Sequence, residues 1–61
     1  MTTARIEELR AEARFLRQRY DLYRARAYGL RPINETRLRE LERTAASAEE
    51  RLRHAEAEAR G

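Results

Sequence analysis

The chain has 61 residues, of which 41% are charged and 41% are hydrophobic, and its formal net charge is +3. A chain of this length forms at most one small domain, and the lack of cysteine excludes disulfides and thiolate metal sites. The apolar runs are too short to span a membrane, and the first residues lack the apolar core of a signal peptide, so we expect a cytoplasmic protein.

The first predicted element is a helix over about residues 3–28 with a long apolar stripe. Thr2 or Thr3 is its expected N-cap, because a threonine hydroxyl accepts hydrogen bonds from a first helical turn. The stripe consists of Ile6, Leu9, Ala13, Leu16, Tyr20, Tyr23, Ala27 and Leu30. Spacings that alternate between three and four residues are typical of a helix that packs along another helix, as in a coiled coil.

A helix stop and a helix start follow within residues 29–34, which we predict to be a turn. Gly29 suits the left-handed residue that ends a helix, and Pro32 prevents the first helix from continuing. Asn34 is the expected N-cap of the next helix. The short connection predicts an antiparallel helical hairpin.

The second predicted helix covers about residues 35–60 and has an apolar stripe of its own. This stripe consists of Leu38, Leu41, Ala45, Ala48, Leu52, Ala55 and Ala59. Folding the chain at the turn places Leu16 opposite Ala45 and Ile6 opposite Ala55, so large residues often meet small ones. Ion pairs four residues apart are expected to support this helix. They are Glu35–Arg39, Glu49–Arg53 and Glu56–Arg60.

The two stripes contain few large side chains, and a single hairpin therefore buries little apolar area. The first helix also has apolar residues almost opposite its stripe. They are Ala11, Phe15, Leu22 and Ala25. We expect this second face to contact another hairpin, another protein or both, and a homodimer would form a four-helix bundle or a longer antiparallel coiled coil. The alternative is that Phe15 and Leu22 are ordinary exposed apolar residues.

The sequence lacks the patterns that catalysis and metal binding require. His54 is the one histidine, and a single histidine without further ligands does not form a metal site. We expect it to be solvated and to pair with Glu50, four residues earlier. The carboxylates are spread over polar helix faces, and there is no glycine-rich phosphate loop. We therefore predict that the protein is not an enzyme and requires no cofactor.

All basic residues are arginines, which reflects either function or the base composition of the genome. Seven of them lie in residues 10–31, against two acidic residues. At the expected edge of the stripe we identify a candidate anion patch. It consists of Arg10, Arg17, Arg24 and Arg31. One interpretation is that these residues flank the stripe and pair with glutamates of a neighbouring helix. The other is that they bind an anion such as nucleic acid.

Another polar row lies on one face of the first helix. It consists of Glu7, Ala11, Arg14, Gln18 and Asp21. An arginine can donate to O6 and N7 of guanine, and a carboxylate can accept from the N1 and N2 donors of the base. Glu7, Arg14, Gln18 and Asp21 are therefore candidate ligand-binding residues.

This row resembles the ligand-reading motif of actinobacterial anti-sigma factors that use cyclic di-GMP. In that family, coiled-coil helices carry Glu, Ser, Arg, Gln and Asp at spacings of four, three, four and four. Glu7, Arg14 and Gln18 match in position. Ala11 replaces the serine, and Asp21 lies one residue before the aspartate position. The resemblance implies a homodimer that presents two copies of the motif and holds a sigma factor with the help of cyclic di-GMP.

The sequence thus predicts an all-α hairpin that acts as a non-enzymatic protein–protein interaction module. The specific form of this prediction is a homodimeric regulator that sequesters a partner such as a sigma factor, with cyclic di-GMP as a ligand. Two alternatives stay open: a nucleic-acid-binding hairpin that uses the arginine-rich residues 10–31, and a purely structural oligomerisation module.

Overall fold

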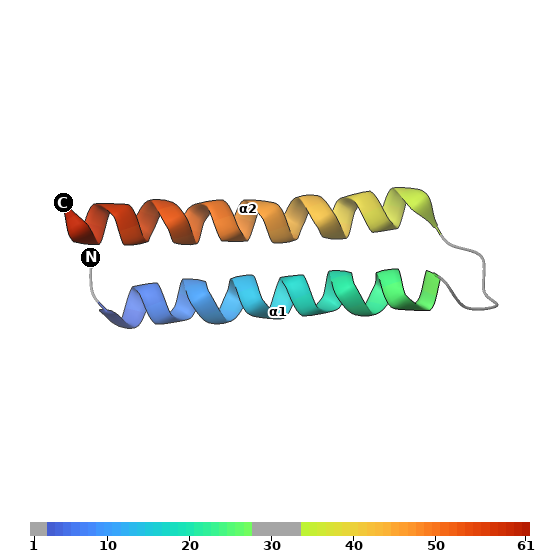
Figure 1. The fold of residues 1–61 in the computed structure, drawn as a ribbon, viewed down its shortest axis with the longest axis horizontal. Coiled ribbons are helices and arrows are strands. Elements are labelled where there is room, and N and C mark those ends of the chain that lie inside the picture. Colours follow the sequence, from blue (N-terminus) through green and yellow to red (C-terminus); the bar gives the residue numbers. More distant parts are fainter. Residues whose placement is uncertain (1–2, 28–33) are drawn as a thin grey trace.

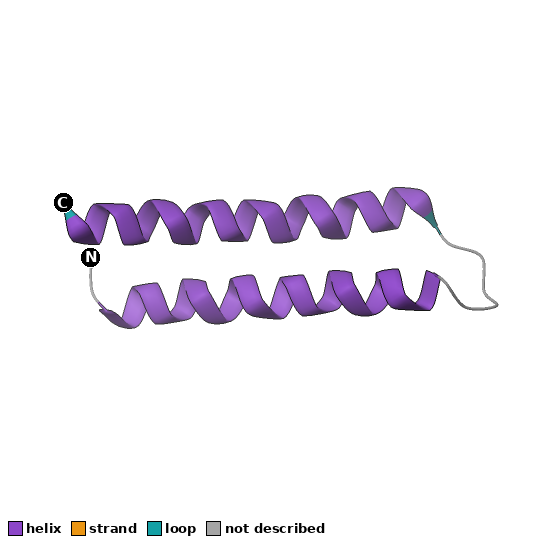
Figure 2. Ribbon diagram, viewed as in Figure 1, coloured by secondary structure: helices purple, strands orange, loops and turns teal. Residues whose placement is uncertain are grey.

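The computed structural model describes residues 3–27 and 34–61, which form two helices. Helix α1 is Thr3–Ala27 and helix α2 is Glu35–Arg60. The helices lie side by side and antiparallel, so that the start of α1 and the end of α2 are at the same end of the hairpin (Figure 1), and the described residues form no strand (Figure 2). The predicted all-α helical hairpin is confirmed.

The beginning and the end of α2 follow from local hydrogen bonds. The Asn34 side-chain oxygen accepts a hydrogen bond from the Arg37 backbone N–H at 3.1 Å, which satisfies a donor of the first turn. Gly61 caps the other end, where its N–H donates to the carbonyls of Ala57 and Glu58 at 3.2 Å. The predicted N-cap at Asn34 is confirmed.

The remaining predictions about helix ends fall mostly outside the described residues. Thr3 is the first helical residue of α1, so the prediction of Thr3 as its N-cap is wrong. Thr2, the other expected N-cap, lies outside the described residues, as do Tyr28, Gly29 and Pro32. The Tyr23 hydroxyl links the last described turns of α1 to the start of α2, since it accepts from the Asn34 N–H at 3.3 Å.

The buried residues all belong to the two predicted stripes, which meet as one seam. They are Leu9, Ala13, Tyr20, Leu41, Ala45, Ala48 and Ala55. A second group of stripe residues is half-buried. It consists of Ile6, Leu16, Tyr23, Leu38 and Leu52. Periodicity thus located the core correctly, because residues three and four apart lie on the same side of a helix.

The prediction for Ala59 is wrong, because its side chain is exposed. The last turn of α2 reaches past the described start of α1 (Figure 1), so no described residue of α1 lies opposite it. Two members of the first stripe cannot be compared in this way. The Ala27 side chain and Leu30 lie outside the described residues.

The most deeply buried positions of the seam are alanines. Ala45, Ala48 and Ala55 are 0%, 1% and 2% exposed, whereas no large side chain among the described residues is less than 2% exposed. Small residues let the helix axes approach closely, but they bury little apolar area, and burial stabilises in proportion to area. The hairpin therefore has a narrow core, of the kind that rarely provides more than roughly 3–5 kcal/mol.

Candidate functional site

One edge of the seam is closed by ion pairs between the helices. We call it the paired edge. It consists of Arg10, Arg17 and Arg24 on α1 and Glu42, Glu49 and Glu56 on α2, each set spaced by seven residues. The Arg10 guanidinium lies 3.2 Å from the Glu56 carboxylate, and the Arg17 guanidinium lies 3.9 Å from that of Glu49. Arginines at one helix edge thus meet glutamates at the matching edge of the other, as in an antiparallel coiled coil.

This edge includes most of the predicted anion patch. Arg10 and Arg17 have glutamate partners, which is the arrangement that the seam-flanking interpretation predicts. A phosphate at this edge would compete with those carboxylates for the guanidinium donors. Arg31, the last member of the patch, lies outside the described residues.

The cross-helix pairs replace two of the pairs predicted within α2. Glu35–Arg39 forms at 3.7 Å. Glu49 and Glu56 instead turn to α1, because they lie beside the seam within reach of its arginines. Arg53, the predicted partner of Glu49, pairs with Glu50 at 2.5 Å. The hydrogen bond from Arg53 and its positive charge lower the pKa of the Glu50 carboxyl.

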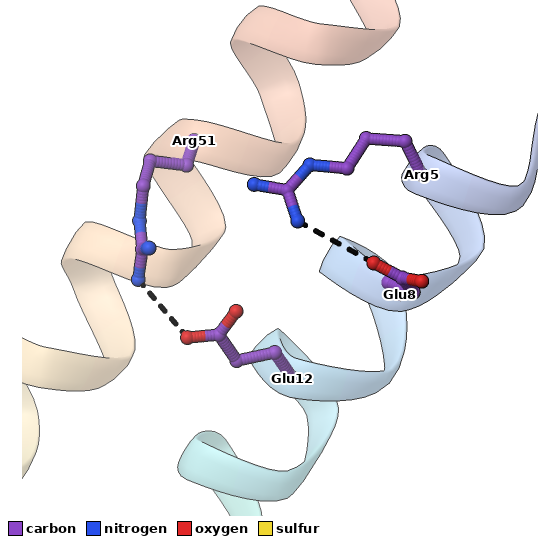
Figure 3. Close-up of polar contacts among 4 residues, drawn as sticks. All are labelled: Arg5, Glu8, Glu12 and Arg51. Atoms are coloured by element: carbon purple, nitrogen blue, oxygen red, sulfur yellow. Dashed lines mark hydrogen bonds and ion pairs between the residues drawn. The ribbon is translucent and has the colours of Figure 1, made fainter. Parts of the chain in front are cut away.

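The opposite edge of the seam, which we call the open edge, carries both charge signs near Glu12 and Arg51 and mainly arginines toward the turn. It consists of Glu12, Arg19 and Arg26 on α1 and Arg37, Thr44 and Arg51 on α2. Near the chain ends, Arg51 reaches across to Glu12 at 3.2 Å, beside the Arg5–Glu8 pair of α1 (Figure 3). Toward the turn this edge carries Arg19, Arg26 and Arg37 together with Thr44, so it has positive charge and no acidic residue.

An open groove lies between the helices at this arginine-rich end. Arg19, Arg26 and Arg37 form its rim, and Leu22, Tyr23 and Leu41 form its apolar floor. Within the described part of the chain, Arg26 makes no ion pair and Arg37 pairs only with Glu40, at 3.7 Å. The groove is therefore an apolar surface with a positively charged border.

The largest uncovered apolar side chains of the described residues lie on α1, on the side away from the seam. Phe15 and Leu22 are 57% and 55% exposed. Together with exposed neighbours they form a second line of residues at spacings of four and three, which we call the outer row. It consists of Ala11, Phe15, Gln18, Leu22 and Ala25. The Arg19 guanidinium lies 5.8 Å from the centre of the Phe15 ring, a cation–π distance. The predicted interface residues are thus exposed together on one face.

The predicted ligand-binding residues are exposed, and three of them share a groove. Arg14, Gln18 and Asp21 line an open groove along the paired edge, whereas Glu7 is not among its lining residues. The Asp21 carboxylate lies 4.0 Å from the Arg17 guanidinium. Arg14 forms no ion pair within residues 3–27 and 34–61. The groove thus places a free guanidinium beside an amide and a carboxylate, all on α1.

The single histidine is an exposed surface residue. His54 pairs with Glu58 at 3.0 Å, four residues later, so the predicted pairing with Glu50 is wrong. Glu50 is held instead by Arg53. In the described residues, no three side chains of the types that ligate metals come together.

Comparison with protein-family models, curated proteins and solved structures found no match to the chain. Neither described helix is long and apolar enough to cross a membrane. Sequence reasoning offered glutamates of a neighbouring helix as partners of these arginines but did not name them, although their signal was visible as the seven-residue repeat of Glu42, Glu49 and Glu56.

Proposed function

We propose that the chain is a non-enzymatic protein–protein interaction module and that its binding surface is the outer row of α1. The observation that carries this proposal is the exposure of Phe15 and Leu22 on a hairpin whose own core is made largely of alanine. Fully burying one such side chain is worth about 1.5–3 kcal/mol. A partner that covered both side chains would gain this free energy of burial, because both side chains are exposed in the isolated hairpin.

The narrow core couples binding to folding. A partner that binds only the folded hairpin shifts the folding equilibrium toward it by mass action. For a hairpin with little stability of its own, this shift is a large part of the free energy of unfolding that is measured in the presence of the partner. Binding at the outer row is therefore expected to raise the melting temperature as well as to form a complex.

The direct test is to make the outer row polar without touching the seam. The variant Phe15→Glu/Leu22→Glu places two carboxylates in the surface, and Ala46→Glu/Ala57→Glu is the matched control, because both alanines are exposed on α2. We expect sedimentation and affinity capture from the source cell to show loss of all complexes for the first variant and no change for the control. Unchanged complexes for the outer-row variant would overturn the proposal.

The groove along the paired edge supports a specific form of this function. Arg14, Gln18 and Asp21 lie together there, and they are residues of the row that resembles the anti-sigma motif. A guanidinium, an amide and a carboxylate on one surface offer both donors and acceptors to a guanine edge. On this basis we propose a regulator that sequesters a partner such as a sigma factor, with cyclic di-GMP bound at α1.

Titration calorimetry with cyclic di-GMP tests the ligand separately from the interaction surface. We expect heat of binding for the natural chain and its loss on Arg14→Ala, with Arg43→Ala on the exposed side of α2 as the control. If the natural chain releases no heat, alone or together with a captured partner, the nucleotide is excluded and the interaction module stands without it.

A further inference from the structure

We infer that the partner of the outer row is a second copy of this chain, packed antiparallel against it through α1. The two α1 helices meet in the middle, and each α2 helix lies on the outside. This inference rests on the interaction surface proposed above and names its occupant. Because it pairs Arg14 with Asp21 and packs Gln18 in the seam, the second copy takes the place of the nucleotide at these residues. The observations that carry it are the spacing of the outer row and the charges on both sides of it.

The outer row has the geometry of a coiled-coil seam. Its members alternate at spacings of four and three, so they form one stripe along the middle turns of α1. Gln18 is the polar residue at the centre of this stripe.

Two lines of charged residues flank the outer row. The first flank consists of Glu7, Arg14 and Asp21, and the second flank consists of Glu12, Arg19 and Arg26. In an antiparallel helix pair, each flank faces the equivalent flank of the other helix. The hairpin itself shows this rule, because Arg10 meets Glu56 on one edge and Glu12 meets Arg51 on the other.

One antiparallel register satisfies these charges. When Leu22 packs opposite Ala11 of the second copy, Phe15 packs opposite Gln18 in the adjacent layer. Arg14 then lies opposite Asp21 of the second copy, and Glu12 lies opposite Arg26. Two-fold symmetry makes each of these contacts twice. The single like-charge contact is Arg19 against its own copy near the symmetry axis.

The neighbouring arrangements bring like charges together. A shift by one heptad in one direction places Arg19 opposite Arg26, and a shift in the other direction places Glu7 opposite Asp21. A parallel pair in register places Arg14 beside Arg19 and Glu7 beside Glu12. Like charges at such positions are destabilising. The charge pattern therefore selects the antiparallel register with Leu22 against Ala11.

The charges that this register uses are available for it. Arg14 and Arg26 make no ion pair in the described part of the chain, and Asp21 is held only at 4.0 Å by Arg17. Glu12 is engaged by Arg51 (Figure 3) and would share its second carboxylate oxygen. Exposed ion pairs contribute little individually. The ion pairs between the two copies therefore determine the register, and burial of Phe15 and Leu22 provides most of the affinity of the dimer.

A charge-reversal series with sedimentation equilibrium tests the register. Arg14→Asp alone and Asp21→Arg alone each turn two attractive contacts of the dimer into repulsive ones, and we expect each to weaken the dimer about tenfold. The double variant Arg14→Asp/Asp21→Arg restores both contacts and is expected to dimerise like the natural chain. An equimolar mixture of the two single variants is expected to form mixed dimers. Arg43→Asp, with the same change of charge on the exposed side of α2, is the control and leaves the dimer unchanged.

Disulfide cross-linking provides a second test of the register, which applies if the charge-reversal variants lose helicity. The chain has no cysteine, so introduced ones report on proximity alone. A mixture of Ala11→Cys and Leu22→Cys chains is expected to oxidise to a mixed disulfide dimer, whereas Leu22→Cys mixed with Ala25→Cys is not.

The outcomes separate this inference from the proposed function. A dimer that the double variant fails to restore, or that cross-links equally with both cysteine pairs, overturns the register. A natural chain that stays monomeric at all concentrations overturns the second copy as partner. In that case the proposed function is still decided by whether Phe15→Glu/Leu22→Glu abolishes capture of another protein.

Discussion

The two helices of this hairpin differ in how many of their sides carry apolar residues. Helix α2 has one apolar stripe, which faces α1, and apart from His54 its other exposed positions are charged, small or hydroxylated. Helix α1 has the same kind of stripe and, almost opposite it, the outer row with Phe15 and Leu22 exposed. A helix with one apolar side needs only one neighbouring helix to bury that side. A helix with two such sides lies between two neighbours, and the hairpin supplies only one.

Placing a charge in the seam is expected to have the largest effect. Ala45→Asp puts a carboxylate at a position of the seam that is 0% exposed. An unpaired buried charge costs several kcal/mol, which is comparable to the whole stability of so small a core. Circular dichroism should show loss of helix at room temperature. The neighbouring Ala46→Asp, on the exposed side of α2, should remain helical, and equal loss for both would mean that the seam does not hold the hairpin.

Removing the large side chains of the outer row is expected to weaken the association of hairpins without preventing their folding. In Phe15→Ala/Leu22→Ala the seam is intact and alanine favours helix, so the hairpin should fold. The melting temperature of the natural chain should rise with concentration, because association stabilises the folded state, whereas that of the variant should not. Thermal melts over a hundredfold range of concentration measure this. If the melting temperature of the natural chain does not change with dilution, the outer row of α1 does not mediate association.

The N-cap of α2 is expected to contribute about 1 kcal/mol. Asn34→Ala leaves the Arg37 backbone N–H without its side-chain acceptor at the first turn. Denaturant unfolding should show a lower midpoint with an unchanged slope. Asn34→Asp, which keeps an acceptor oxygen at the same place, should retain most of the stability.

The paired edge is expected to contribute less, about 0.5 kcal/mol per exposed pair. Glu49→Arg places a second cation beside Arg17 and should lower the free energy of unfolding, and Arg17→Glu/Glu49→Arg should restore most of it. High salt should reduce the difference, since it screens exposed charges. No loss of stability for Glu49→Arg would mean that the Arg17–Glu49 pair is not formed in solution.

The smallest effect concerns pH. The pKa of Glu50 is lowered from its usual 4.5 in the folded chain, mainly by its hydrogen bond from Arg53. A lowered folded-state pKa gives stability that is present above about pH 4.5 and is lost as the pH falls through the folded-state value. Glu50→Gln should therefore flatten the acid side of the stability profile slightly. An unchanged profile would mean that this exposed pair is fully screened.

Local signals in the sequence were sufficient for the secondary structure. The spacing of apolar residues from Ile6 to Tyr23 predicted α1 and its buried side, and Asn34 predicted the start of α2, because helix periodicity and capping depend on residues within a few positions of each other. Exposure of Phe15 and Leu22 followed from the same spacing. The candidate interaction surface was therefore predictable as soon as the seam was.

The choice of ionic partners was not predictable in this way. Glu49 and Glu56 each have an arginine four residues later, yet both pair with α1, and His54 pairs with the glutamate after it and not the one before it. Each of these groups has several partners within reach of a flexible side chain. The helix-to-helix register decides which of them is near, and local spacing carries no information about it.

The sequence by itself determined that this protein is two helices with one shared seam and a second apolar row on the first of them. Only the tertiary structure decided that Ala59 is left uncovered, that one edge of the seam is neutralised by cross-helix pairs and the other ends in arginines, and that Arg14, Gln18 and Asp21 share a groove. The physical reason is one of range. Helix formation depends on neighbours along the chain, whereas electrostatic pairing and groove shape depend on where the second helix lies against the first.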